Sequence, residues 1–207
     1  MAWKVERWLA EVFPGKERIY EEYRNLPARE LAIVSAAVLD LALAELLTLR
    51  LADIPKEVEE FLGLDSNGRA AAGSFGARIQ LGLLVGLLTS EDAAMLRAMK
   101  GLRNEFAHRV RVSFTSPGPL KALEKIFLLW MAHQERTAEA RGVPPAALDA
   151  MRELRPLLAT SEDACQGLLL AAFSTYQAMF HRMHGRVTRL DRPLFQGSRP
   201  ASDRQPA

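Results

Sequence analysis

The segment PARELAIVSAAVLDLALAELLTLRLA, residues 27–52, decides the class of fold. It is rich in Ala and Leu, Pro27 suits the first turn of a helix, and Pro55 lies just beyond the end. We therefore predict one long helix over residues 27–52. Asp40 and Glu45 interrupt its apolar run, and each would be costly at the centre of a bilayer. We interpret the segment as a helix of a soluble protein rather than a membrane span.

The composition is that of an ordinary globular protein of one domain. The chain has 207 residues and a mass of 23.0 kDa, and it is 49% hydrophobic and 25% charged, so it can bury a core without disulfides. Its 27 basic and 25 acidic residues leave a net charge of +2, which gives no global field directed at nucleic acid. The single cysteine, Cys165, excludes an internal disulfide and a cysteine-based zinc site.

The sequence lacks the patterns that mark export, membrane insertion or metal binding. The amino-terminal MAWKVERW is charged where a signal peptide needs an apolar core. The longest uncharged run, residues 164–180, is slightly short of a membrane span. No cluster of His, Cys, Asp and Glu has metal-ligand spacing. We predict a cytoplasmic protein with no membrane segment, no metal and no cofactor.

Capping and turn signals divide the rest of the chain into further helices, and sustained strand-like alternation is almost absent. The exception is VRVSF, residues 110–114, which we predict to be a short extended piece. The fold class is therefore all-α, a single multi-helix bundle over residues 1–185 with a flexible basic, Pro-containing tail over 186–207. The other predicted helical segments are 3–12, 16–25, 56–63, 73–88, 90–108, 116–141, one that starts at Pro144 with a kink at Pro156, and 161–183.

One segment, residues 97–111, concentrates side chains that could carry chemistry. It holds five basic residues and a histidine against a single acid, and its centre is Arg-Asn-Glu-Phe-Ala-His (103–108). On an ideal helix Asn104 and His108 share a face, whereas Arg103 and His108 are separated by roughly 140°. Arg103 and His108 can meet over one phosphate only if the helix ends or distorts here, or if a second copy of the chain supplies one of the two groups.

Two interpretations of this segment are open. An arginine can grip a phosphate and stabilise charge that develops on it, and an imidazole can act as general base or acid near neutral pH. Arg103, Asn104 and His108 would then suffice for attack of an RNA 2′-hydroxyl on its own neighbouring phosphate, with no metal. The same residue types at a helix end also complement the helix dipole and cap free carbonyl groups, which is a purely structural role.

Three blocks of the sequence, in order, resemble the mannitol operon repressor (MltR-like) family over about residues 20–130. They are RELAIVSAAVLDLALAELL (29–47), GSFGARIQLGLLVGLLT (73–89) and SEDAAMLRAMKGLRNEFAHRVRVSF (90–114). The stretch LRNEFAH is also similar to the signature of HEPN-type helical domains, a superfamily of dimeric, metal-independent RNases that has many inactive members. Besides the signature, the matching positions are Gly73, Ser74, Phe75, Arg78 and Phe106.

The resemblance implies an all-helical homodimer that acts in transcriptional control of sugar-alcohol uptake genes. Members of this family resemble regulators without a DNA-reading element, which implies action through a protein partner. The HEPN signature transfers onto Arg103, Asn104 and His108, which two protomers would bring to one shared site. We rank a partner-dependent regulator first, a HEPN-type metal-independent endoribonuclease second and a direct DNA-binding repressor a distant third. The operon, the partner and the role of residues 140–207 stay open.

Asp40 is the remaining candidate, because a carboxylate inside an apolar helix needs a partner if it is buried. We hypothesise that it pairs with Arg78 or with Arg103 and so fixes the bundle. The alternative is that Asp40 lies at the border of its helix, in water.

Overall fold

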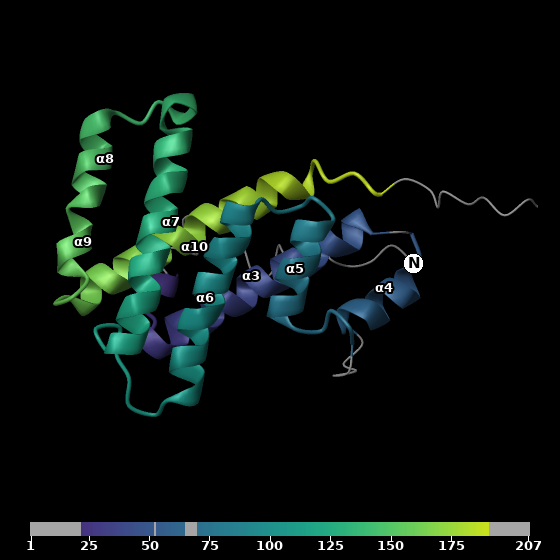
Figure 1. Cartoon of the computed structure of the whole chain (residues 1–207), viewed down its shortest axis with the longest axis horizontal. Helices are drawn as coiled ribbons and strands as arrows, with labels where there is room; N and C mark the ends of the chain where they lie inside the picture. Colours follow the sequence, from purple (N-terminus) through teal and green to yellow (C-terminus); the bar gives the residue numbers. More distant parts are fainter. Residues whose placement is uncertain (1–21, 52, 65–69, 191–207) are drawn as a thin grey trace, which may run out of the picture.

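The computed structural model describes residues 22–51, 53–64 and 70–190, and all the regular structure in these ranges is α-helical (Figure 1). The prediction of an all-α fold is confirmed. The helix predicted over 3–12, and nearly all of the one predicted over 16–25, lie outside the described residues. The helices of the described ranges are α3 (Ala28–Arg50), α4 (Pro55–Leu62), α5 (Phe75–Leu84), α6 (Ser90–His108), α7 (Pro117–Arg141), α8 (Pro145–Arg152), α9 (Leu154–Leu157) and α10 (Glu162–His184).

Helix α3 is the centre of the bundle. Helices α4, α5, α6 and α10 all pack against it, and Leu31, Leu39, Leu43 and Leu47 along its length are fully buried. By length and composition α3 could cross a membrane, but 67% of its apolar window is buried inside the protein. A helix that is apolar on most of its faces needs such cover, so the packing accounts for its composition.

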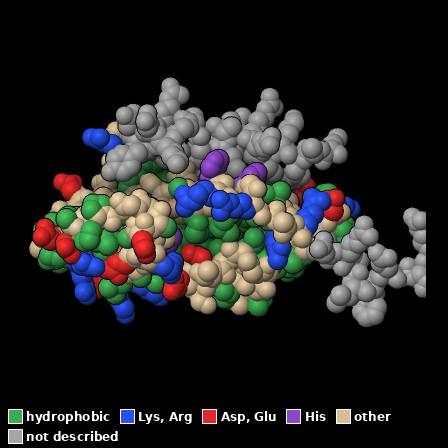
Figure 2. Space-filling model, turned by 90° about the horizontal axis from the view of Figure 1, so that it is seen from above, with side chains coloured by type: hydrophobic (Ala, Val, Ile, Leu, Met, Phe, Trp, Pro, Cys, Tyr) green, Lys and Arg blue, Asp and Glu red, His purple; other side chains and the backbone are tan. Residues whose placement is uncertain are grey.

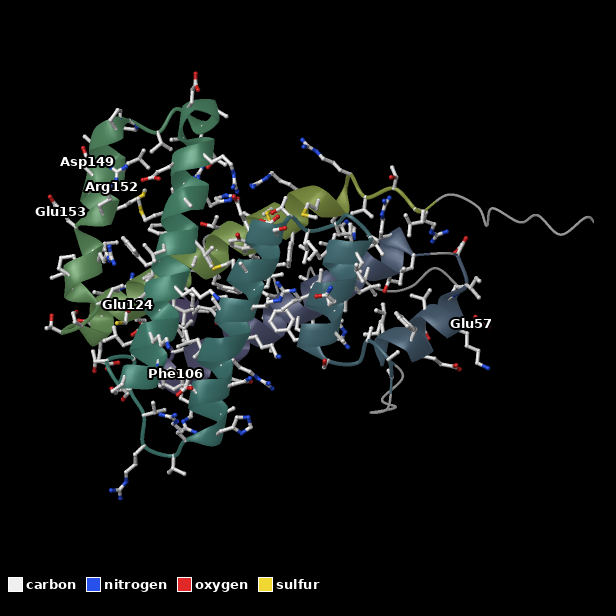
Figure 3. All side chains as sticks on the ribbon, in the orientation of Figure 1. Glu57, Phe106, Glu124, Asp149, Arg152 and Glu153 are labelled. Carbon is white, nitrogen blue, oxygen red and sulfur yellow. The ribbon has the colours of Figure 1, made fainter. Side chains whose placement is uncertain are left out.

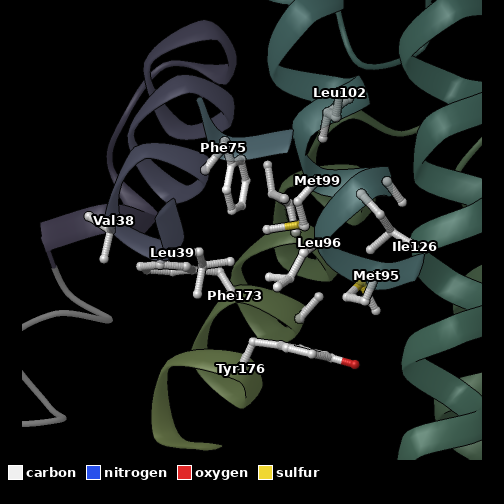
Figure 4. Close-up of a cluster of buried hydrophobic side chains, with 14 of the residues drawn as sticks. Val38, Leu39, Phe75, Met95, Leu96, Met99, Leu102, Ile126, Phe173 and Tyr176 are labelled. Carbon is white, nitrogen blue, oxygen red and sulfur yellow. The ribbon is translucent and has the colours of Figure 1, made fainter. Parts of the chain in front are cut away.

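The core forms where α6 and α7 cross α3 and α10 (Figure 1). Side chains of α3, α4, α5, α6, α7 and α10 form one buried cluster, part of which Figure 4 shows. Examples, one from each of α3, α5, α6, α7 and α10, are Leu39, Phe75, Leu96, Ile126 and Phe173. Cys165 is also fully buried and packs in this cluster as a small apolar residue. Helix α6 lies among the other elements, so anything at its ends is held by the whole bundle.

Two helix boundaries differ from the prediction. Helix α5 stops at Leu84 instead of residue 88, because Gly86 adopts a left-handed φ of 71° and the amides of Leu87 and Leu88 both donate to the carbonyl of Gly82, at 2.8 and 3.0 Å. The helix that begins near Pro144 is interrupted at Glu153, between α8 and α9. Pro156 accounts for the break, since its ring crowds the carbonyl four residues earlier.

The two non-helical predictions also need revision. Residues 110–114 form no strand, and they belong to a loop between α6 and α7. Of the predicted flexible tail, residues 186–190 are described, and they return to the end of α3, where the amide of Leu190 donates to the carbonyl of Arg50 at 2.8 Å. The rest of that tail, 191–207, lies outside the described residues.

The guanidinium of Arg78 joins four parts of the bundle. From α5 it donates to Oδ1 of Asp40 on α3 at 2.8 Å, to the carbonyl of Leu62 at the end of α4 at 2.7 Å, and to the carbonyl of Ala72 at 3.1 Å. The Arg78 side chain is 7% exposed and the Asp40 side chain 23%. Asp40 therefore does pair with Arg78, and every nitrogen of this guanidinium has a protein acceptor.

We predict that Arg78→Ala lowers the free energy of unfolding by about 3 to 5 kcal/mol, because it leaves a half-buried carboxylate and two carbonyl groups without their donor. Urea unfolding followed by circular dichroism measures this change. The matched control is Arg97→Ala on α6, whose exposed side chain bonds only to Gln80 at 2.9 Å, with an expected loss below about 0.5 kcal/mol. Equal losses in the two variants would contradict the role given to Arg78.

Glu45 is a second carboxylate inside α3. Only 4% of its side chain is exposed, and its Oε1 lies 2.7 Å from Nε2 of His184 at the end of α10. Burial raises the pKa of Glu45 from its ordinary value of 4.5 to about 7. The Glu45–His184 contact joins the end of α10 to the central helix.

The raised pKa of Glu45 gives the stability a pH dependence of definite sign. The folded chain keeps this proton up to about pH 7, whereas the unfolded chain releases it near 4.5, so the free energy of unfolding falls by about 3 kcal/mol as pH rises through this window. Urea titrations at pH 5 and pH 7.5 measure the fall. Glu45→Gln should remove it, and Glu57→Gln on the surface of α4 should not (Figure 3). A fall that survives in Glu45→Gln would assign the pH dependence to another group.

Candidate functional site

Helix α6 carries the candidate site, and its first turn is held by a capping box. The hydroxyl of Thr89 accepts a bond from the amide of Asp92 at 3.1 Å, and the Asp92 carboxylate accepts bonds from the amide and hydroxyl of Thr89 at 3.1 and 2.7 Å. The hydroxyl of Tyr176, on α10, donates to the other oxygen of Asp92 at 3.3 Å. Burial, together with this carboxylate, raises the pKa of Tyr176 and keeps its hydroxyl protonated as a donor.

The last turn of α6 is held by a residue from another helix. His108 is the final helical residue, and Arg109 is extended, with φ −123° and ψ 128°. The guanidinium of Arg29, at the start of α3, donates to the carbonyl groups of Arg109 and Val110, the second at 2.8 Å. The chain therefore leaves α6 in a direction that Arg29 fixes.

The loop that follows is held by α10 and by the core. The carboxylate of Glu162 accepts bonds from the amides of Phe114 and Thr115, both at 3.0 Å, and from the Thr115 hydroxyl at 2.8 Å. Burial acts to raise the pKa of Glu162, but these bonds outweigh it and lower the pKa below its ordinary value. Phe114 also packs edge-on against Phe106, with ring centres 5.1 Å apart.

Phe106, near the lower end of α6, is therefore a core residue (Figure 3). The neighbouring Glu105 faces α7. Its carboxylate lies 3.3 Å from Nε of Arg109 and occupies the space that a side chain on Gly118 would need. Glu105 thus closes the contact between the end of α6 and the first turn of α7, and it neutralises one of the basic residues of the segment.

The three signature side chains lie at this fixed helix end and are accessible. Arg103 and His108 are exposed and Asn104 is half-buried. Arg103 donates to the amide oxygen of Asn104 in a weak contact of 3.4 Å, and within the described ranges neither Arg103 nor His108 is bound to a carboxylate or a backbone carbonyl. Arg103 also attracts Asp40, since its charge acts to lower the raised pKa of that carboxyl.

Further positive charge surrounds the signature. Lys100, one turn earlier on α6, reaches over the first turn of α5, where its Nζ would lie 2.9 Å from a Cβ on Gly76. Arg111 is exposed in the following loop. Of the acids in the surroundings, Asp40 is paired with Arg78 and Glu105 with Arg109. The end of α6 is thus a basic surface suited to an anion.

The remaining positions of the resemblance build the start of α5. Ser74 is its N-cap and accepts a bond from the amide of Ala77 at 3.2 Å, Phe75 is buried in the core, and Gly73 lies close to the backbone of Ala70. With Arg78 they position α5 against α3 and do not enter the basic surface. Arg78 is linked to the site through Asp40. It contacts this carboxylate, whose pKa is raised by burial and lowered by the charges of Arg78 and Arg103.

Sequence reasoning missed Arg29 and Glu162, the two residues that fix the exit from α6. Each acts on backbone groups between 47 and 81 positions away, so no local pattern marks it. Among the described residues, no group of three or more His, Cys, Asp and Glu side chains is placed to hold a metal ion.

Comparisons with known proteins add no relative. No family model matches the chain, and no curated protein and no solved structure matches it. The site must be interpreted from its own geometry.

The fit of Glu105 against α7 can be tested by substitution. Gly118→Ala would push its methyl group into the Glu105 carboxylate, the end of a flexible side chain that can shift, so we predict a small loss of about 0.5 to 1 kcal/mol in the free energy of unfolding, measured by urea unfolding. In a Glu105→Ala background the same substitution should be close to neutral. Gly101→Ala, on α6 where a methyl group meets only open space, is the control and should not destabilise. A loss that is the same in both backgrounds would contradict the contact.

Proposed function

We propose that this chain binds RNA at the end of α6 and cleaves it without a metal ion, with Arg103, Asn104 and His108 as the reacting groups. The observation that supports this most is the role of Arg29. In a structural role the signature side chains would complement the helix dipole and cap the carbonyl groups at the end of α6. Within the described ranges Arg103 and His108 bind no backbone carbonyl, and Arg29 binds the carbonyl groups just beyond that end. The signature side chains are left accessible on a rigid helix end, among basic residues.

The order of the two leading hypotheses changes for this reason. The regulator ranked first on the strength of the three-block resemblance, and the comparisons give that resemblance no further support. The nuclease rests on residues whose exposure and surroundings suit the chemistry. It therefore becomes the first candidate.

The proposed reaction is an internal transfer of the phosphodiester. His108 takes the proton from the 2′-hydroxyl, the resulting oxygen attacks the adjacent phosphorus, and the bond to the 5′-oxygen of the next nucleotide breaks. The 5′-oxygen leaves as a hydroxyl after it receives a proton, and the other product ends in a 2′,3′-cyclic phosphate. Arg103 stabilises the negative charge on the phosphoryl oxygens, and Asn104, in contact with Arg103, orients that guanidinium or the substrate.

The spacing of Arg103 and His108 leaves two arrangements for the site. In the first arrangement one copy supplies both groups, which requires the helix to end or distort near the signature. Helix α6 does end at His108, so its imidazole is free to turn toward Arg103. A homodimer would meet the second condition, with Arg103 and His108 from different protomers. We keep the homodimer as part of the proposal.

The test is cleavage of a labelled, structured RNA by the purified chain in EDTA. We predict 2′,3′-cyclic ends, and loss of at least a hundredfold in rate for His108→Ala and for Arg103→Ala. Two matched controls should keep the wild-type rate, His181→Ala and Arg182→Ala, which replace exposed residues of α10. If wild type and His108→Ala cleave equally, the activity belongs to a contaminant and the proposal is wrong.

The same variants decide between one copy and two. When Arg103→Ala and His108→Ala proteins are mixed and allowed to exchange subunits, a site shared across a dimer recovers about a quarter of the wild-type rate, since half of the dimers are mixed and each has one intact site. No recovery, with exchange verified by two affinity tags, would assign all reacting groups to one protomer.

A regulator that acts through a protein partner is the second candidate, and Val110 favours it. This side chain is 90% exposed, directly beside the signature, in a loop whose backbone is held by Arg29. A rigid, exposed apolar side chain suits contact with another protein. Nascent and total RNA from cells that carry His108→Ala or Val110→Asp separate the two functions. Slower RNA decay that appears only with His108→Ala supports the nuclease, and changed RNA synthesis rates that appear only with Val110→Asp support the regulator.

A further inference from the structure

A cavity lies at the opposite end of α6 from the signature. It is formed between the end of α3, the connection from α5 to α6, and the segment that follows α10, and its volume is about 250 Å³. Among the residues that line it are Arg50, Gly86, Arg186 and Thr188. Since α6 has 19 residues at about 1.5 Å each, roughly 28 Å of helix separates this cavity from the basic surface around His108.

Arg50 forms a fixed wall of the cavity. Its Nε donates to the carbonyl of Val85 at 3.1 Å, and its Nη1 donates to the carbonyl of Thr188 at 2.7 Å. The segment after α10 is fastened here by two further contacts, from the amide of Leu190 to the carbonyl of Arg50 at 2.8 Å and from Arg189 to Asp53 at 2.5 Å. The guanidinium of Arg50 is thus oriented before any ligand arrives, which lowers the entropic cost of binding.

The charge of this cavity is positive and uncompensated. No acidic residue is part of its lining, and the acceptors of Arg50 are neutral oxygens. Arg186 is exposed and forms no ion pair with any other residue of the described ranges. The carboxylate of Glu45, five residues before Arg50, is buried and contacts His184 instead.

The surroundings add to the positive potential. Figure 2 shows Lys and Arg side chains beside histidines on one face of the molecule. Two histidines and two arginines lie in the last turn of α10 and just beyond it. They are His181, Arg182, His184 and Arg186. Nε and Nη1 of Arg50 already donate to backbone carbonyls, so the donors left for an anion are its Nη2 and the guanidinium of Arg186. N–H groups of guanidinium ions bind phosphate oxygens well.

We propose that this cavity binds a small soluble molecule through its phosphate group, with Arg50 and Arg186 as the phosphate ligands. The cavity is shallow and open to solvent, and its volume of about 250 Å³ suits a small ligand. Gly86 contributes no side chain to the wall, so the space beside the backbone stays open. The cavity adjoins the connection that leads into the capping box at Thr89, so a bound phosphate would stabilise the start of α6.

Isothermal titration of the full chain with inorganic phosphate, pyrophosphate and glycerol 3-phosphate tests the proposal, with glycerol and NaCl of equal ionic strength as blanks. We predict saturable binding of at least one phosphate compound, and at least tenfold weaker binding for Arg186→Ala. Arg182→Ala, one turn earlier and outside the cavity lining, is the matched control; it removes only a more distant charge and should weaken binding less than about twofold. Arg50→Lys keeps the positive charge but loses the planar guanidinium with its several N–H donors. It should also weaken binding while the chain stays folded.

Several results would overturn this site. Equal binding by wild type and Arg186→Ala would place the anion elsewhere, and equal weakening by Arg182→Ala would indicate a diffuse basic patch. Vesicles of phosphatidylglycerol form a further arm, because a lipid headgroup presents the same phosphate chemistry. Binding to vesicles without binding to any soluble phosphate would assign the patch to a membrane surface and contradict the proposal. None of these readouts involves RNA cleavage, so the cavity and the nuclease can fail separately.

Discussion

The bond between Arg78 and Asp40 is the constraint on which the rest of the structure depends. A guanidinium placed among helices α3, α4 and α5 is costly unless all its donors are used, and here the carboxylate of Asp40 and two backbone carbonyls use them. The consequence is geometric as well as energetic. It fixes α5 against α3 and leaves Asp40 beside Arg103, so the arrangement of the core also determines the electrostatic environment of the candidate site.

Helix α6 is held at both ends, and this is what makes it a suitable support for chemistry. The capping box of Thr89 and Asp92, reinforced by Tyr176, fixes its start. Arg29 fixes its exit, and Glu162 holds the loop beyond. Side chains on a helix end that cannot fray keep their positions without a substrate, and this preorganisation is what stabilisation of a charged transition state requires. The proposed phosphate cavity at the other end of the helix would act on the same rigid element.

Features set by neighbouring residues could be predicted from the sequence, whereas contacts between residues far apart in the sequence mostly could not. The bounds of α6 followed from local signals, an acidic first turn and a basic last one, and the structure confirms them at Ser90 and His108. The end of α5 was predicted four residues too late, because only the backbone shows that Gly86 has a positive φ. The pair of Asp40 and Arg78 could be proposed from the cost of a buried charge. Arg29 and Glu162 could not, because their partners are backbone groups of a distant loop.

The central claim is that RNA contacts the end of α6. Photocrosslinking with RNA that contains 4-thiouridine, followed by mass spectrometry of the digested full chain, tests it most directly. We expect the crosslinked peptides to come from residues 97–111, and the crosslinks to decrease when Arg103 is replaced by Ala and to persist when Arg182 is replaced. Crosslinks confined to the last turns of α10, or no crosslinks above those of a bystander protein, would contradict it.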